Sequence, residues 1–120
     1  MPAFHQHRDK AIHNEDFVAE LNNPYWDWAI TATFYSALHY VEAFLACKPI
    51  PIHSRNHEVR DDNIQRDALL TRIYDDYRQL KDDSHNARYD ARMTLTQTDY
   101  AYAKKYLEKI KAAIVPTFPA

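Results

Sequence analysis

Residues 25–47 read YWDWAITATFYSALHYVEAFLAC, and this stretch carries apolar side chains on nearly every face of a helix. A helix of that kind is buried at the centre of a bundle, or lies between a bundle and its dimer partner. Pro24 precedes the stretch, and Pro49 and Pro51 follow it, so the prolines bound the helix without interrupting it. The stretch therefore predicts the central helix of an all-α fold.

The chain of 120 residues contains no glycine. Walker phosphate loops, dinucleotide-binding GxGxxG turns and two-residue Asn-Gly hairpins all depend on a residue without a Cβ atom, so the sequence excludes them. A sheet fold without glycine would be unusual, whereas a helical bundle would not. The length suits one domain, which we expect to span residues 1–120 with an N-terminal arm at 1–7 and a C-terminal tail at 115–120.

Four further helical segments are predicted around the central one. Their apolar residues recur at spacings of three and four, which is the period of an amphipathic helix. Ser54 and Thr96 can cap two of the starts, and Asp99 stands three residues after Thr96. The predicted segments cover about residues 8–21, 55–65, 67–91 and 96–114. The chain is therefore expected to be all-α, an up-and-down bundle of four long helices plus one short helix.

Composition limits the partners and the compartment of the chain. Fifteen Lys and Arg residues against seventeen Asp and Glu residues give a formal net charge of −2, so a site for a polyanion must be a local cluster. Cys47 is the only cysteine, which excludes an intrachain disulfide and suits a reducing cytoplasm. No signal peptide or lipidation motif is recognised, and polar residues interrupt the longest apolar run. We therefore expect a cytoplasmic protein with no membrane span.

Ser36, His39 and Glu42 form a slanting polar line on the otherwise apolar central helix. Buried polar groups need hydrogen-bond partners, so these residues either bond one another, a neighbouring helix or a second subunit, or they transfer protons. The seven histidines invite a metal interpretation as well. However, neither close pair, at 5 and 7 or at 53 and 57, lies beside a HExxH motif, a Glu-x-x-His on a facing helix or a Cys pair. No metal ion and no other cofactor is therefore expected.

The central helix resembles the second helix of HEPN domains, the nucleotide-binding family of higher eukaryotes and prokaryotes, over residues 28–45. The resemblance continues in HSRNHEVR at 53–60, YRQL at 77–80, NARYD at 86–90 and the last helix from 99 to 110. HEPN proteins are helical bundles that usually form dimers. Some are toxins that cut RNA without metal, and others bind nucleotides or RNA or partner a minimal nucleotidyltransferase. The resemblance implies the same range of activities here.

Active HEPN proteins carry the motif Arg-x4–6-His, and the resemblance implies that Arg78 and His85 are the catalytic pair. Seven residues are about two helical turns, so both side chains leave nearly the same face of the 67–91 segment. In such a pair the guanidinium holds the scissile phosphate and the imidazole moves a proton. The alternative is an ordinary surface, on which Arg78 pairs with Asp75 or Asp82.

Two polar segments are candidates for binding a phosphate or nucleotide. One is the start of the short helix, where free backbone N–H groups favour an anion, and the other offers a guanidinium beside an aromatic ring. By resemblance, both segments line the polar groove of the family. The predicted binding residues are Arg55, Asn56, His57, Arg60, Arg88 and Tyr89. The alternative is a capped helix start with solvated charges and a tyrosine that closes the end of the bundle.

The sequence thus predicts a HEPN-like protein that binds RNA or a nucleotide, with metal-independent ribonuclease activity of the toxin or defence type as its catalytic form. Six of the nine tyrosines fall on the last two long segments, where a homodimer face would explain their number. The alternative function is a non-catalytic helical partner or scaffold subunit, for example of a nucleotidyltransferase. A third possibility is a bundle whose polar residues serve only stability and dimerisation.

Overall fold

A computed structural model describes residues 3–21 and 25–119. The described residues form five α-helices and two short 3-10 helices and include no β-strand. The α-helices are α1 (Phe4–Glu20), α2 (Trp26–Ala46), α3 (His57–Arg66), α4 (Tyr74–Tyr89) and α5 (Gln97–Ile114), and the 3-10 helices are η1 (Leu70–Ile73) and η2 (Val115–Thr117). The prediction of an all-α fold is therefore confirmed.

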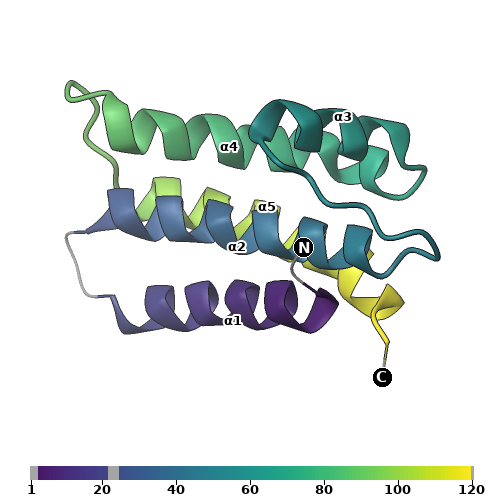
Figure 1. Ribbon diagram of the computed structural model, residues 1–120. Coiled ribbons are helices and arrows are strands. Elements are labelled where there is room, and N and C mark those ends of the chain that lie inside the picture. The colour runs from purple at the N-terminus through teal and green to yellow at the C-terminus, as the bar shows by residue number, and fades with distance from the viewer. Residues whose placement is uncertain (1–2, 22–24, 120) are drawn as a thin grey trace.

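Helix α2 lies at the centre and packs against α1, α4 and α5 (Figure 1). The axes of the long helices are nearly parallel, and successive long helices run in opposite directions (Figure 1). Helix α3 lies beside the first half of α4 (Figure 1). Most of α2 is buried, as expected for a helix that is apolar all round. No helix in the described ranges is long and apolar enough to cross a membrane.

The core is built mainly from α2 and the inner faces of α4 and α5, with smaller contributions from α1, α3 and η1. Phe34 of α2 meets Tyr77 of α4 with ring centroids 5.6 Å apart, and both side chains are fully buried. The inner stripe of α5 is buried at the predicted positions, namely Ala103, Leu107, Ile110 and Ile114. Thr96 and Asp99 form the capping box that starts α5, since the Thr96 N–H donates to Asp99 Oδ2 at 2.8 Å. The predicted start of this helix is therefore confirmed.

The ends of the chain are more ordered than predicted. Helix α1 begins at Phe4 rather than at about residue 8, so the described part of the expected arm is largely helical. The Phe4 ring meets Phe118 edge to face with centroids 4.8 Å apart. Residues 115–117 of the expected tail form η2. The contact between Phe4 and Phe118 joins positions far apart in the sequence, which explains why local patterns did not reveal this order.

Helix α3 begins at His57 because Asn56, and not Ser54, is its N-cap. Asn56 Oδ1 accepts a hydrogen bond from the Val59 N–H at 2.8 Å. Ser54 is buried instead, and its hydroxyl accepts a hydrogen bond from Asn63 Nδ2 at 2.9 Å. The prediction of a Ser54 cap is wrong because this side chain has a partner further along the chain.

The predicted helix over residues 67–91 is divided in two. Asp67 accepts hydrogen bonds from the backbone N–H groups of Leu69 at 2.9 Å and Leu70 at 3.0 Å. The same carboxylate pairs with Lys48 Nζ at 2.5 Å, which fixes it against the loop after α2. The chain therefore turns at Asp67 into η1, and α4 begins only at Tyr74.

Candidate functional site

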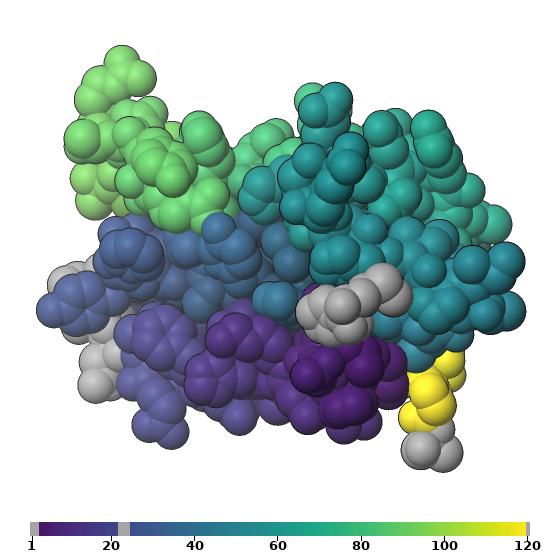
Figure 2. All heavy atoms as spheres, viewed as in Figure 1, coloured from purple at the N-terminus to yellow at the C-terminus, as the bar shows by residue number. Residues whose placement is uncertain are grey.

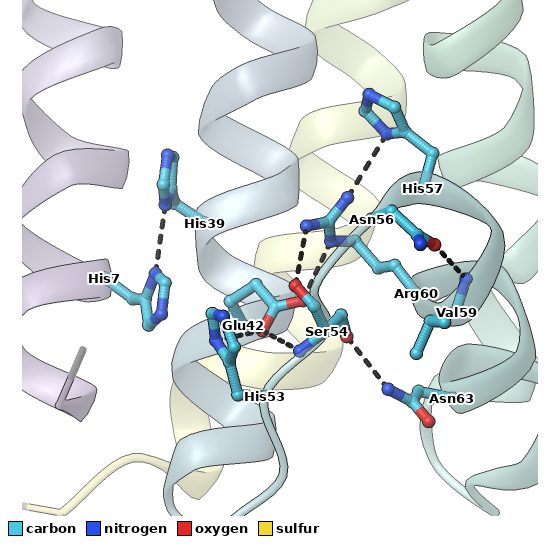
Figure 3. A network of polar contacts seen from close by, with 10 residues as sticks. All are labelled: His7, His39, Glu42, His53, Ser54, Asn56, His57, Val59, Arg60 and Asn63. Atoms are coloured by element: carbon cyan, nitrogen blue, oxygen red, sulfur yellow. Dashed lines mark hydrogen bonds and ion pairs between the residues drawn. The ribbon is translucent and has the colours of Figure 1, made fainter. Parts of the chain in front are cut away.

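A buried ion pair joins α2 to α3 (Figure 3). Glu42 Oε1 accepts a hydrogen bond from Arg60 Nε at 2.8 Å, and the two residues are only 1% and 8% exposed. Glu42 Oε2 accepts from the Ser54 N–H at 3.2 Å, and Arg60 donates from its NH2 group to the Ser54 carbonyl at 3.4 Å. A charge in a protein interior needs partners of this kind to offset its lost hydration. The pair therefore holds α3 and the loop before it against α2.

Three histidines from different elements lie beside this ion pair (Figure 3). His53, in the loop before α3, places Nδ1 3.9 Å from Glu42 Oε2. The Nδ1 atoms of His7 in α1 and His39 in α2 lie 3.1 Å apart, so one ring donates a hydrogen bond and the other accepts it. The His7 and His53 rings stack with centroids 6.1 Å apart. The fold thus brings together imidazoles from three parts of the chain.

Burial keeps the His7 and His39 imidazoles neutral near pH 7. Desolvation is the largest cause and lowers the pKa of His39 to about 4, with the neighbouring His7 acting in the same direction. Desolvation also lowers the pKa of His7, although the negative charge of Glu42 opposes this shift. A neutral imidazole has one bare nitrogen, which can accept a proton or ligate a metal ion.

The polar line on α2 bonds to neighbouring elements. The Ser36 hydroxyl donates to the Ala11 carbonyl of α1 at 2.9 Å, His39 meets His7, and Glu42 meets Arg60. The prediction that these groups bond a neighbouring helix is therefore confirmed. A role in proton transfer stays a prediction.

The residues predicted to bind phosphate at the start of α3 have different surroundings. Arg55 and His57 are exposed, whereas the Asn56 side chain caps the helix. Arg60 is held in the buried pair with Glu42. The Arg60 NH1 group also lies 3.2 Å from His57 Nδ1 and can only donate, so Nδ1 accepts and Nε2 of the neutral imidazole carries the proton. Arg55 and His57 are therefore the exposed ligand candidates of this segment.

Arg88 lies close to two tyrosine rings. Its NH1 group donates to the Tyr35 hydroxyl at 2.9 Å, and its guanidinium carbon lies 5.4 Å from the ring centroids of both Tyr35 and Tyr89. The Arg88 Nε atom is buried, and among the described residues it has no hydrogen-bond partner. The pKa of His57 is lowered, first by burial and then by the positive charges of Arg60, Lys81 and Arg88. The two predicted binding segments therefore interact electrostatically.

Arg78 and His85 lie on one exposed flank of α4, seven residues apart. Arg78 Nε lies 4.0 Å from Asp82 Oδ2, which matches the predicted alternative of an ordinary surface pair. The His85 ring lies 4.9 Å from the Tyr89 ring. Tyr89 thus lies close to both His85 and Arg88. The catalytic role of the pair stays a prediction.

A groove between α1 and α2 exposes large apolar side chains. Phe17 and Trp28 line it and are 47% and 54% exposed. Tyr35 and His39 line it further along α2, so it reaches the partners of Arg88 and His7. Figure 2 shows α2 at the surface between α1 and the pair formed by α3 and α4. The apolar groove and the polar groups therefore belong to one face of the molecule.

Sequence reasoning missed one group of residues. His7, Glu42 and His53 each offer a possible ligand atom, and these atoms all lie within 4.8 Å of one another. The residues are widely separated in the sequence, so a search for closely spaced ligand pairs could not find them. The available signal was a carboxylate on an apolar helix, since a buried charge needs partners from elsewhere.

In comparisons with known proteins, no family model, no curated protein and no solved structure matches this chain. The resemblance to HEPN domains therefore rests on the sequence patterns quoted above, and the functions that it implies are proposals.

Proposed function

We propose that this chain is a HEPN-like protein that binds RNA or a nucleotide and acts as a homodimer. The observation that carries the proposal is the setting of Arg88, whose guanidinium carbon lies 5.4 Å from the ring centroids of both Tyr35 and Tyr89. A guanidinium binds phosphate oxygens through a planar set of donors, and aromatic rings stack on bases. Arg88 and the exposed Tyr89 supply both groups at one end of α4.

The charge of Arg88 supports this proposal. Within the described chain, neither Arg88 nor Arg55 has a carboxylate oxygen within 4.0 Å, whereas Arg60 is paired with Glu42. The hydrogen bond from Arg88 goes to a neutral tyrosine hydroxyl, so the positive charge remains available to an anion. An unneutralised guanidinium attracts a phosphate more strongly than a paired one.

His57 adds a donor to the same neighbourhood. Its lowered pKa keeps the ring neutral at pH 7, and the hydrogen bond from Arg60 to Nδ1 leaves the ring proton on Nε2. An exposed N–H can donate to a phosphate oxygen or to a base edge. His57 and Arg88 therefore offer a neutral and a charged donor from two helices.

The catalytic form of the proposal is a metal-independent ribonuclease that uses Arg78 and His85. Arg78 holds the scissile phosphate, and His85 transfers a proton to or from the reacting oxygen. His85 contacts Tyr89, and Tyr89 lies beside Arg88, so the proposed catalytic histidine adjoins the proposed binding residues. In a HEPN-like dimer, two copies of this surface would act on one RNA strand.

Binding is tested with the full-length chain and a fluorescently labelled single-stranded RNA, with ATP as a competitor. We expect Arg88→Gln to weaken binding at least tenfold without lowering the melting temperature. Arg72→Gln is the matched control, because it changes an exposed arginine at the opposite end of the η1–α4 segment, roughly 25 Å away. Equal affinities of the wild type and Arg88→Gln for both RNA and ATP would refute the binding site.

Cleavage is tested separately by incubating the same RNA with the protein in EDTA. We expect cleavage by the wild type, and loss of cleavage in both Arg78→Ala and His85→Ala with unchanged folding. Cleavage retained in both variants would move the activity to other residues. Absence of cleavage in the wild type would leave only the binding form of the proposal.

The second candidate function is a non-catalytic partner subunit, and the exposed Phe17 and Trp28 side chains favour it. Apolar side chains grouped in a surface groove are typical of protein interfaces. Analytical ultracentrifugation of the wild type and Trp28→Ser separates the two. A wild-type dimer that dissociates in the variant supports the homodimer. A monomeric wild type with no RNA or nucleotide affinity supports a different helical partner.

A further inference from the structure

We propose that His7, Glu42 and His53 form a binding site for a divalent transition-metal ion of the zinc type. The three residues come from α1, α2 and the loop before α3, and their possible ligand atoms all lie within 4.8 Å of one another (Figure 3). This inference goes beyond the proposed function, because it uses none of the proposed binding or catalytic residues and involves no RNA or nucleotide.

The ligand set determines the class of metal. Two imidazoles and one carboxylate are a common set in zinc sites that keep a fourth position for water. Imidazole nitrogen suits Zn²⁺, Co²⁺, Ni²⁺ and Cu²⁺, whereas Mg²⁺ and Ca²⁺ prefer sites made of oxygen atoms. Arg60 already neutralises Glu42, so the site attracts a cation through its nitrogen ligands more than through net charge. That arrangement favours a zinc-type ion over magnesium or calcium.

Small side-chain movements are enough to complete the site. Ligand atoms of a tetrahedral zinc ion lie about 3.3 Å apart, given bonds of about 2.0–2.1 Å. The three possible ligand atoms now lie within 4.8 Å of one another, so each distance between them must shorten by about 1.5 Å at most. His53 lies on a loop with its side chain 36% exposed, and its Nδ1 is already 3.9 Å from Glu42 Oε2. Rotation of this one exposed side chain can supply much of the closure.

Neighbouring groups already orient two of the ligands. Arg60 Nε and the Ser54 N–H hold the two Glu42 oxygens, and each oxygen retains a lone pair. When His7 Nδ1 donates to His39 Nδ1, the Nε2 atom of His7 is left bare as a ligand. Outer hydrogen bonds of this kind are usual around metal ligands, because they fix the tautomer and the ring direction.

The test uses the full-length chain without a histidine tag and titrates it with Co²⁺ and Zn²⁺. We expect one Co²⁺ per chain with the visible absorption of a tetrahedral ion. We also expect saturating Zn²⁺ to raise the melting temperature by roughly 5 °C, reversibly with EDTA. His53→Ala and His7→Asn should each weaken binding at least tenfold. His13→Ala, which removes an exposed histidine of α1, is the matched control and should bind like the wild type.

Three results would overturn the proposal. The first is a wild type with neither the tetrahedral Co²⁺ spectrum nor a melting shift with Zn²⁺. The second is unchanged affinity in His53→Ala, which alters only an exposed loop side chain and so keeps the test valid if His7→Asn fails to fold. The third is an equal melting shift with Mg²⁺, because the imidazole ligands would then play no part.

Discussion

Replacing Glu42 by glutamine should lower the unfolding free energy of this protein more than most substitutions of similar size. The substitution keeps the shape of the side chain but removes its negative charge. Arg60 then stays buried with its positive charge uncompensated, because the guanidinium is enclosed between α2 and α3. The interaction is barely screened by solvent, since the two side chains are only 1% and 9% exposed.

The expected loss is about 3–5 kcal/mol of unfolding free energy, as found when one partner of a buried ion pair is removed. That is a large part of the roughly 5–15 kcal/mol by which domains of this kind are stable. The measurement is urea unfolding followed by circular dichroism at 222 nm, with EDTA present so that no metal ion contributes. Asp82→Asn is the matched control, because it removes the charge of an exposed pair with Arg78 and should cost at most about 0.5 kcal/mol.

The double variant Glu42→Leu with Arg60→Met separates the charge from the packing. Replacing both partners by apolar residues removes the uncompensated charge, so the double variant should be more stable than Glu42→Gln alone. It should still be less stable than the wild type, because the Ser54 N–H loses its acceptor. A loss below about 1 kcal/mol in Glu42→Gln would refute the reasoning, because the pair would then contribute no more than a surface pair.

Three further predictions concern stability. Burial alone would raise the pKa of Asp67, but Lys48 and two backbone N–H donors outweigh it and lower that pKa. The carboxylate therefore adds to the unfolding free energy above its unfolded pKa of about 3.9, and this contribution is lost as the pH falls through the folded pKa. In urea unfolding, the difference in unfolding free energy between the wild type and Asp67→Asn should therefore narrow below about pH 4. The Tyr77 hydroxyl is buried and has no hydrogen-bond partner in residues 3–21 and 25–119. Tyr77→Phe should therefore leave the unfolding free energy unchanged or raise it. A loss above about 1 kcal/mol would reveal a hydrogen bond to the hydroxyl. Thr96→Ala removes the N-cap of α5 and should lower stability by about 1 kcal/mol in the same assay, whereas no change would mean that the end of α5 is frayed.

Local signals predicted the parts of this fold that depend on local interactions. The apolar run of α2 and its flanking prolines predicted a central helix, and the pairing of Thr96 with Asp99 predicted the start of α5. The errors lie where distant residues decide the outcome. Lys48 helps to fix the turn at Asp67, and no local pattern reveals that contact.

The candidate site shows the same difference between local and distant interactions. Glu42 stood out in the sequence as a carboxylate on an apolar helix, but its partner Arg60 was predicted to hold a phosphate instead. The sequence contains both charges without showing that the fold joins them. The group of His7, Glu42 and His53 escaped notice for the same reason, because ligands supplied by three elements have no fixed spacing.

The polar face of α2 is nevertheless where we expect function to lie. Tyr35, His39 and Glu42 are spaced by four and three residues, so they share one face of the helix. Tyr35 meets Arg88, His39 meets His7, and Glu42 meets Arg60. Burying two charges costs several kcal/mol of lost hydration per ion, so a buried ion pair is weak evidence for a role in stability alone. We therefore propose that these polar groups serve binding as well as folding, with an anion bound near Tyr35 and a metal ion bound at Glu42.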